Sequence, residues 1–371
     1  NPLLFSSLQD SLVIEGLIRL IVSDTENFDL AVIELPHGTI RMTEGLEILV
    51  GVVTNLTPDH MEEFDSYSDY IQRNLSIKDL LHENGILVVN GDDPILSQAD
   101  LDNYETIYYG LNQPKTIEYK DEVYKNTEKK ELNILAHQIK DKGLYGSEFE
   151  VKVFKIPTLI CGNCMKINCD CSTFKRQYME NQTTKIEISL PSIFNIENTL
   201  ATIATTLAWG YDLKTAKACV ETFTKLKGRF EKIITVDNVD VYMDAAHNPD
   251  SIEMLLNSLK VEGRLIVTLD NPDTLTIRDK LRIGQIIGKY ADVLIVSAKN
   301  ETTKTIDTNA AKEVLDGAKL DEQHMTMDVK EAMKQALKIA VKGDLIIHMG
   351  PGVVNEYQNV KNDILRALPP L

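Results

Sequence analysis

Residues 244–251 read Asp-Ala-Ala-His-Asn-Pro-Asp-Ser, and they connect the apolar segment Val239–Met243 to the amphipathic segment Ser251–Leu259. The apolar segment predicts a buried strand, and the amphipathic one predicts a helix with Asn248 as N-cap and Pro249 at its first position. Open α/β folds bind ligands at such junctions, where a helix N-terminus offers backbone N–H groups to anions. The stretch therefore predicts a doubly wound α/β fold with a candidate site at this turn, although an ordinary strand-to-helix turn would show the same cap.

The size and charge of the chain limit its function. Its 371 residues exceed what one hydrophobic core usually holds, so we expect two or more domains. A net charge of -17 and an isoelectric point near 4.9 argue against a nucleic-acid partner, because phosphate binding needs a basic surface. The longest apolar runs, such as Ile48–Val53, are far shorter than a membrane span of about 20 residues, and no signal peptide is visible. We therefore expect a cytoplasmic enzyme without a membrane partner.

The N-terminal part alternates strand and helix patterns. Asp29–Leu35, Leu49–Leu56 and Gly85–Asn90 predict buried strands of a parallel sheet, and Tyr67–Leu81 predicts a crossover helix. The chain begins with Asn1 instead of Met and enters what resembles mid-domain sequence. We therefore expect that an N-terminal part precedes it.

Residues 115–190 differ in composition, because Lys, Glu, Asn and Tyr dominate there. Short alternating runs at Phe149–Ile156 and Lys185–Leu190 predict an antiparallel flap around a group of cysteines. We expect this segment to be an insertion into the first domain.

Two helices, Ile196–Trp209 and Leu213–Leu226, follow the flap, and strands and helices alternate again after Gly228. The chain therefore divides into a first domain of residues 1–233 and a second of residues 234–371. The further elements predicted for the second domain are strands at Arg264–Asp270, Asp292–Ala298 and Asp344–Met349 and helices at Ile277–Tyr290, Asn309–Ala318 and Val329–Val341.

Two polar side chains stand where predicted strands of the first domain end. Glu34 closes one strand, and His60 closes the string Thr54–His60 after the next. The carboxyl ends of parallel strands share one edge of the sheet, so both could converge on one hard cation. Taken singly, Glu34 would be a surface acid and His60 a solvated or capping residue.

Three more residues carry candidate chemistry. Asn195 and Asn198 lie three apart, on one face of a helix, and their amides can donate to and accept from a purine edge. Arg229 lies at the domain junction, where a guanidinium can bridge phosphates. Capping by Asn195 and solvent exposure of the other two are the alternatives.

Four cysteines, Cys161, Cys164, Cys169 and Cys171, have C-x2-C-x4-C-x-C spacing. Closed sites of four thiolates are usually structural zinc sites, so we predict zinc here. An iron–sulfur cluster and an unliganded group of thiols are the alternatives.

Taken in order, the motifs of the chain resemble those of the Mur ligase family over nearly its whole length. They are Glu34 with His37, Thr-Asn-x-Thr-x-Asp-His at 54–60, Asn-Gly-Asp-Asp-Pro at 90–94, Phe-Asn-x-x-Asn at 194–198, Gly-Arg-Phe-Glu at 228–231 and Asp-x-Ala-His-Asn-Pro-Asp-Ser at 244–251. The resemblance implies a P-loop-type central domain, lacking its N-terminal strand and phosphate loop, followed by a Rossmann-like C-terminal domain. It also implies an ATP-dependent ligase that joins a carboxylate to an amine through an acyl phosphate.

The resemblance assigns a role to each candidate residue. Magnesium is held by Glu34 and His60, and the adenine of ATP contacts Asn195 and Asn198. Arg229 contacts phosphate, and Asp244 contacts the ribose. His247 and Asn248 face the reacting centre. The partners implied are a small-molecule or peptide carboxylate and an amino acid or amine.

The sequence departs from the family in three places. No Gly-x-x-Gly-Lys-Thr phosphate loop is present, which we attribute to truncation; the alternative is a protein that does not bind ATP phosphates in the usual way. Lys78 is the candidate for the family's carbamylated catalytic lysine, but it comes later after Tyr70 than usual, and Arg73 and Asn74 fall nearer. Ser297-Ala298-Lys299-Asn300-Glu301 stands where an Asp-Asn-Pro-Arg string marks diaminopimelate or lysine addition, so the amine is not identified.

We expect a ligase of cell-wall peptide synthesis or a related pathway, and a zinc-bearing insertion would suit an archaeal pseudomurein-type peptide ligase. Alternatives of the same class are an amidating subunit that works with a glutaminase and ligases of tetrapyrrole-cofactor or cyanophycin type. A non-catalytic zinc protein derived from the family is the alternative of a different class.

Overall fold

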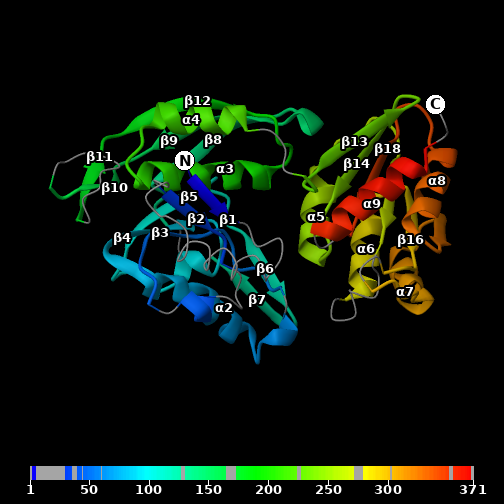
Figure 1. The fold of residues 1–371 in the computed structure, drawn as a ribbon, viewed down its shortest axis with the longest axis horizontal. Helices are drawn as coiled ribbons and strands as arrows, with labels where there is room; N and C mark the ends of the chain where they lie inside the picture. The colour runs from blue at the N-terminus through cyan, green and yellow to red at the C-terminus, as the bar shows by residue number, and fades with distance from the viewer. Residues whose placement is uncertain are drawn as a thin grey trace. The chain divides into compact units, whose positions relative to one another are not determined.

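The structure is a computed structural model. The residues it describes are 2–5, 30–35, 40–43, 45–59, 61–126, 130–163, 173–223, 227–270, 279–300, 303–350 and 354–368. The chain divides into two compact units, Asn1–Phe223 and Thr224–Leu371 (Figure 1). Among the described residues, no helix is both long enough and apolar enough to cross a membrane.

A six-stranded sheet forms the centre of the first unit. Neighbouring strands follow the order β12-β9-β8-β5-β4-β3, with parallel pairing from β3 to β8 and antiparallel pairing from β8 to β12. These strands are β3 (Ile48–Val53), β4 (Leu81–Asn90), β5 (Glu105–Gly110), β8 (Ile134–Asp141), β9 (Ser147–Val153) and β12 (Gln182–Ile188). The antiparallel pairing predicted for residues 115–190 is thus confirmed for β9 and β12, but these strands extend the central sheet instead of forming a separate flap.

Three smaller strand pairs lie among the described residues of this unit. They are the parallel pair β1 (Pro2–Phe5) and β2 (Leu30–Ile33), the hairpin β6 (Thr116–Tyr119) and β7 (Glu122–Lys125), and the hairpin β10 (Ile156–Cys161) and β11 (Phe174–Met179). The helices are α2 (Tyr67–Leu75), α3 (Ile193–Ala208) and α4 (Leu213–Thr222), with 3-10 helices η2 (Ile40–Thr43), η3 (Met61–Glu63), η4 (Ser76–Leu80), η5 (Leu96–Gln98) and η6 (Gly143–Tyr145).

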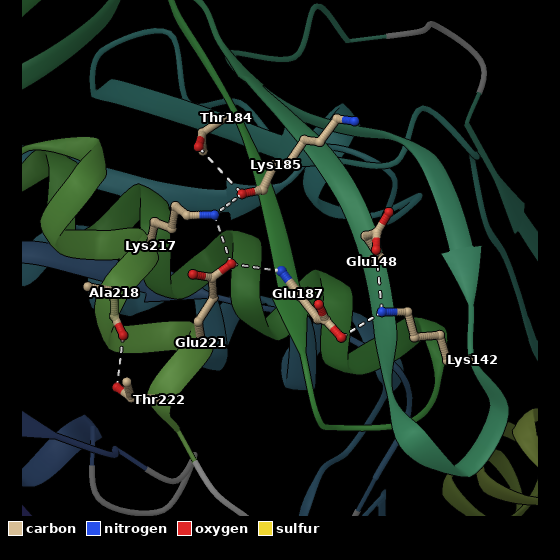
Figure 2. A network of polar contacts seen from close by, with 9 residues as sticks. All are labelled: Lys142, Glu148, Thr184, Lys185, Glu187, Lys217, Ala218, Glu221 and Thr222. Atoms are coloured by element: carbon tan, nitrogen blue, oxygen red, sulfur yellow. Dashed lines mark hydrogen bonds and ion pairs between the residues drawn. The ribbon is translucent and has the colours of Figure 1, made fainter.

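Alternation along β4 explains the layers of this unit. Successive side chains of a strand point to opposite faces. Ile86 and Val88 pack with α3 and α4, whereas Leu87 and Val89 pack with α2, and all four side chains are fully buried. Figure 1 shows α3 and α4 on one side of β4 and β5, and α2 on the other. Polar contacts add to the packing of α4: Glu221 accepts from the Glu187 backbone N–H of β12 at 3.0 Å (Figure 2).

Several predicted helix boundaries were wrong, and the helix predicted to end at Leu226 ends at Thr222. The crossover helix ends at Leu75, because Ser76 turns back and its hydroxyl donates to the Arg73 carbonyl at 2.7 Å. The chain then forms η4 and enters β4 at Leu81, four residues before the predicted strand. Helix α3 begins at Ile193 with Ser192 at its N-cap, so Asn195 lies inside the first turn instead of capping it.

The second unit also has a six-stranded sheet, in the order β13-β14-β18-β15-β16-β17, and only the pair β13–β14 is antiparallel. Its strands are β13 (Glu231–Val236), β14 (Val239–Asp244), β15 (Leu265–Leu269), β16 (Val293–Ser297), β17 (Glu322–Thr326) and β18 (Leu345–Met349). Its helices are α5 (Pro249–Ser258), α6 (Lys280–Tyr290), α7 (Thr308–Ala318), α8 (Val329–Ile339) and α9 (Val354–Arg366). The predicted boundary near residue 233 lies inside β13.

Helices α8 and α9 cover one face of this sheet, and α5, α6 and α7 pack side by side. The chain passes from β14 through α5 to β15, and β18 later inserts between these two strands. The chain therefore leaves the adjacent strands β15 and β18 in different directions. In open α/β folds, ligands bind at the strand ends where this happens. The doubly wound fold predicted for this unit is confirmed.

Candidate active site

Asp244 ends β14 and is 7% exposed. One carboxylate oxygen accepts from the Phe230 backbone N–H at 2.7 Å, and the other accepts from the Ala246 N–H, also at 2.7 Å. Burial raises the pKa of this carboxyl, although both N–H groups and the nearby Arg229 charge act to lower it. Asp244 therefore fixes the chain around Arg229 to the end of a buried strand.

Arg229 lies between two residues with left-handed backbone, Gly228 at φ +73° and Phe230 at φ +44°. The Phe230 ring is buried and stacks on Tyr242 with 4.5 Å between ring centroids. The Gly228 carbonyl accepts from the Ala245 N–H at 3.0 Å. This backbone leaves the Arg229 side chain exposed, as the recognition of an anion requires.

The turn after Asp244 forms the predicted cap. Asn248 accepts from the Ser251 N–H at 2.8 Å, and the Ser251 hydroxyl accepts from the Asn248 N–H at 3.2 Å, which completes a capping box. Nδ1 of His247 lies 2.6 Å from the Ala245 carbonyl. The tautomer that donates this hydrogen bond has Nε2 as its acceptor atom.

In the first unit, Asn195 and Asn198 lie in the first two turns of α3. The Asn195 side-chain amide donates to the Pro191 carbonyl at 2.6 Å, and the Asn198 side chain is exposed. Asn195 keeps its carbonyl oxygen and one N–H for another partner.

Sequence reasoning missed the residue between these asparagines. Glu197 is 5% exposed, and one of its oxygens lies 2.6 Å from Nζ of Lys115, a residue that follows β5. Burial raises the pKa of Glu197, while Lys115 acts to lower it. This ion pair joins the start of α3 to the loop after β5.

The string Asn90-Gly91-Asp92-Asp93 has a structural role next to that pair. Asp92 accepts from the Leu111 N–H at 2.5 Å, and Asp93 accepts from the Leu56 N–H at 3.1 Å. Both aspartates are buried, and burial raises their pKa values. The string thereby joins the ends of three neighbouring strands, and it was the sequence signal that marked this region.

A second group missed in the sequence lies on the neighbouring strands β15 and β18. Thr268 and His348 are fully buried cross-strand partners, with 2.8 Å between the threonine hydroxyl and Nδ1. Nε2 of His348 lies 3.5 Å from a carboxylate oxygen of Asp270. Ser297, from the string that replaces Asp-Asn-Pro-Arg, is also fully buried at the end of β16.

Only part of the predicted metal sites lies within the described residues. Glu34 directly follows β2 and is exposed, whereas His37, His60, Cys164, Cys169 and Cys171 are outside the described residues. Cys161 ends β10, is buried, and accepts a hydrogen bond from the Asn163 N–H at 3.3 Å. In the part of the chain that is described, no three His, Cys, Asp or Glu side chains gather closely enough to hold a metal ion.

Lys78 lies in η4 instead of the crossover helix. Its Nζ is 3.1 Å from a carboxylate oxygen of Asp79 and 3.3 Å from the Tyr104 hydroxyl. Burial acts to lower the pKa of Lys78, but these two partners raise it above its ordinary value. Carbamylation needs a neutral amine, and these two partners favour the charged one; a carbamylated Lys78 stays a prediction.

Fold and candidate residues together define a protein of two α/β units, each with a parallel-rich sheet. Residues 15–154 match the family model described as Mur ligase middle domain, and residues 228–352 match the one described as Mur ligase, glutamate ligase domain. The chain belongs to the Mur ligase family.

Two relatives match parts of the chain. An uncharacterized protein of Methanothermobacter thermautotrophicus is 59% identical over 118 residues, 31% of this chain and 38% of that protein. A UDP-N-acetylmuramoyl-L-alanyl-D-glutamate--2,6-diaminopimelate ligase of Clostridium botulinum is 25% identical over 359 residues, 95% of this chain and 64% of that ligase. The chain thus spans less than two thirds of either relative.

A solved structure shows the same fold. A pseudomurein peptide ligase type C from Methanothermus fervidus aligns with a TM-score of 0.67 and 21% identity, covering 91% of this chain and 68% of that one.

Proposed function

We propose that this protein is an ATP-dependent ligase that forms a peptide or isopeptide bond through an acyl phosphate. A substrate carboxylate oxygen attacks the γ-phosphorus of ATP and ADP leaves. The amine of a second substrate then displaces phosphate from the acyl carbon and loses a proton. The observation that carries the proposal is the junction at which Asp244 holds the backbone of Arg229, in a family whose members are ATP-dependent acid–amino-acid ligases.

The second-unit residues fit their proposed roles. Each oxygen of Asp244 accepts one backbone N–H and keeps acceptor capacity, which suits ribose hydroxyl groups. The exposed Arg229 suits phosphate, and charge-assisted bonds of guanidinium to phosphate are strong. His247 and Asn248 follow at the same strand end, where we place the reacting centre.

The first-unit residues supply the remaining contacts of the proposal. Asn195 and Asn198 would bind adenine, and Glu34 and His60 would hold magnesium. Magnesium, when bound, neutralises phosphate charge. Exclusion of water from such a site strengthens these interactions.

We place the reaction in the synthesis of a cell-wall peptide in the cytoplasm, specifically of the archaeal pseudomurein type. Two relatives support this: the Clostridium botulinum ligase, named for addition of diaminopimelate, and the structural neighbour named a pseudomurein peptide ligase. The substrates would be a peptide carboxylate and an amino acid. An amidating subunit that depends on a glutaminase would instead show turnover with ammonia.

The test is phosphate release from ATP by the complete protein, screened over pairs of carboxylate and amine. Hydroxylamine should trap the acyl phosphate as a hydroxamate even without the amine. We expect Asp244→Ala and Arg229→Ala to lose turnover and Lys289→Met, which removes an exposed ion pair with Glu253, to keep it. Wild-type turnover in Asp244→Ala would contradict the proposed site, and no carboxylate-dependent turnover with any pair would contradict the function.

We also propose a structural zinc bound by the four cysteines. The support within the described residues is the Asn163 N–H that donates to the sulfur of Cys161, because such a bond favours the thiolate. Anaerobically purified protein should hold about one zinc per chain. The metal should be lost in Cys161→Ser/Cys164→Ser and kept in Cys219→Ser, whose cysteine is exposed on α4. Bound iron with visible absorption would show that the cysteines hold an iron–sulfur cluster and not zinc. The absence of any metal would contradict the site.

A further inference from the structure

Glu231, the first residue of β13, joins helix α9 to the backbone before Arg229. One of its carboxylate oxygens lies 2.6 Å from Nζ of Lys361. The other accepts from the Gly228 N–H at 3.0 Å and from the Tyr357 hydroxyl. The Glu231 and Lys361 side chains keep only 17% and 24% of their exposure, so water screens this ion pair less than a surface pair.

The aromatic ring of Tyr357 also packs directly on Gly228. A Cβ atom at this glycine would lie 3.0 Å from Cδ2 and 3.2 Å from Cε2 of the ring. Gly228 is therefore held on three sides: by the ring, by the Glu231 carboxylate at its N–H, and by the Ala245 N–H at its carbonyl. Only a residue without a side chain fits this position at φ +73°.

The other neighbour of Arg229 is held from the strand end, because the Phe230 N–H donates to Asp244. The backbone on both sides of Arg229 is thus fixed within the second unit, while the Arg229 side chain remains exposed. One set of contacts comes from the end of β14, and the other comes from α9, more than a hundred residues later in the chain.

We propose that Glu231, Tyr357 and Lys361 form a positioning cluster that sets Arg229 for the phosphates of ATP. This inference rests on the proposed function of Arg229. None of the three residues needs to touch the nucleotide: Lys361 and Tyr357 orient the Glu231 carboxylate, and that carboxylate fixes the Gly228 N–H. A displacement of a binding group by about 1 Å can cost on the order of 100-fold in rate, so a loosened Arg229 should be costly.

The test is a double-mutant cycle on kcat/KM for ATP in the complete protein. We expect Lys361→Met to lower kcat/KM by about 10- to 100-fold in the wild-type background and to have no further effect in Arg229→Ala. Lys289→Met is the matched control, because it also removes a lysine ion pair of this unit, at 2.9 Å from Glu253, and should leave kcat/KM unchanged.

A second measurement does not depend on turnover. Amide hydrogen exchange at Gly228 should become faster in Lys361→Met and in Tyr357→Phe, while exchange in the core strand β15 stays at the wild-type rate. If Arg229→Ala itself keeps full activity, the proposed function of Arg229 fails. If Arg229→Ala loses activity but Lys361→Met does not, or if the two losses multiply, the positioning cluster is refuted.

Discussion

The partly buried ion pair between Lys115 and Glu197 allows a sharp test of how the start of α3, where we propose that adenine binds, is held. Lys115→Met keeps most of the side-chain volume but removes the cation 2.6 Å from a nearly buried carboxylate. Breaking a buried pair costs about 3–5 kcal/mol when both partners are desolvated. Lys115 keeps 35% of its side-chain exposure and Glu197 keeps 7%, so we reduce the expected loss to about 2–4 kcal/mol near neutral pH.

The loss should grow with pH. Burial already raises the pKa of Glu197 above 4.5, so protonation of Glu197 stabilises the fold fully below 4.5, and this contribution is lost as pH rises through the raised value. Without Lys115 the pKa of Glu197 rises further, because the charge that lowered it is gone. The difference between wild type and Lys115→Met should therefore be smaller at pH 5 than at pH 8.

The only tryptophan of the chain provides the assay. Trp209 packs against the core of the first unit, so its fluorescence reports the melting of that unit. At about 2–4 °C per kcal/mol, the melting temperature should fall by about 4–16 °C at pH 8. In a protein that also carries Glu197→Gln, the effect of Lys115→Met on the melting temperature should lose most of its pH dependence, because the group that titrates is gone.

Lys142→Met is the control for this prediction. Lys142 forms ion pairs with Glu148 at 3.3 Å and with Glu187 at 2.6 Å, but both lie at the surface of β9 and β12 (Figure 2). Exposed pairs contribute little, so no measurable change in melting temperature is expected. A Lys115→Met protein that melts like wild type at pH 8, or that shows an equal loss at both pH values, would refute the reasoning.

Two further substitutions test the second unit. Gly228→Ala should lower the free energy of unfolding by about 1–2 kcal/mol because of the left-handed backbone, and by more because the new methyl group contacts the Tyr357 ring. Urea unfolding should show this loss, and ATP turnover should fall as well. Wild-type values in both assays would contradict the packing. Asp344→Ala should cost about 3 kcal/mol in urea unfolding, because Asp344 pairs with Arg264 at 2.8 Å and accepts from two backbone N–H groups. Burial acts to raise the pKa of Asp344, but these partners lower it below its ordinary value. The stability that Asp344 contributes is therefore present at neutral pH and is lost as pH falls through the lowered value. A difference in stability between wild type and Asp344→Ala that stays the same in acid would contradict this reasoning.

The sequence predicted the parallel strands of the second unit because they are buried on both faces and read as continuous apolar runs. β15, β16 and β18 all lie within one residue of their predicted ends. β17 was missed, because it is an edge strand of sequence Glu-Gln-His-Met-Thr with only Thr326 buried. Helix α9 was also missed, although Tyr357, Val360 and Ile364 follow a helical spacing that could have revealed it.

Within the first unit, composition changed at residue 115 and indicated a separate insertion. β8, β9 and β12 instead continue the central sheet, because strand pairing depends on partners distant in sequence, which composition does not reveal. The sequence also misplaced the cap of α3. Asn195 was a candidate for it, and only the folded helix shows that Ser192 precedes its first residue.

The order of motifs by itself determined the family, and the turn at 244–251 determined its strand, cap and helix, because these signals are local in the chain. Only the tertiary structure decided which side chains hold the motifs in place. Glu197 meets Lys115 across 82 residues and Glu231 meets Lys361 across 130, so no local pattern records either contact. Both ion pairs require the sheets and helices to pack, since packing takes these carboxylates largely out of water and brings each lysine within 2.6 Å of its partner.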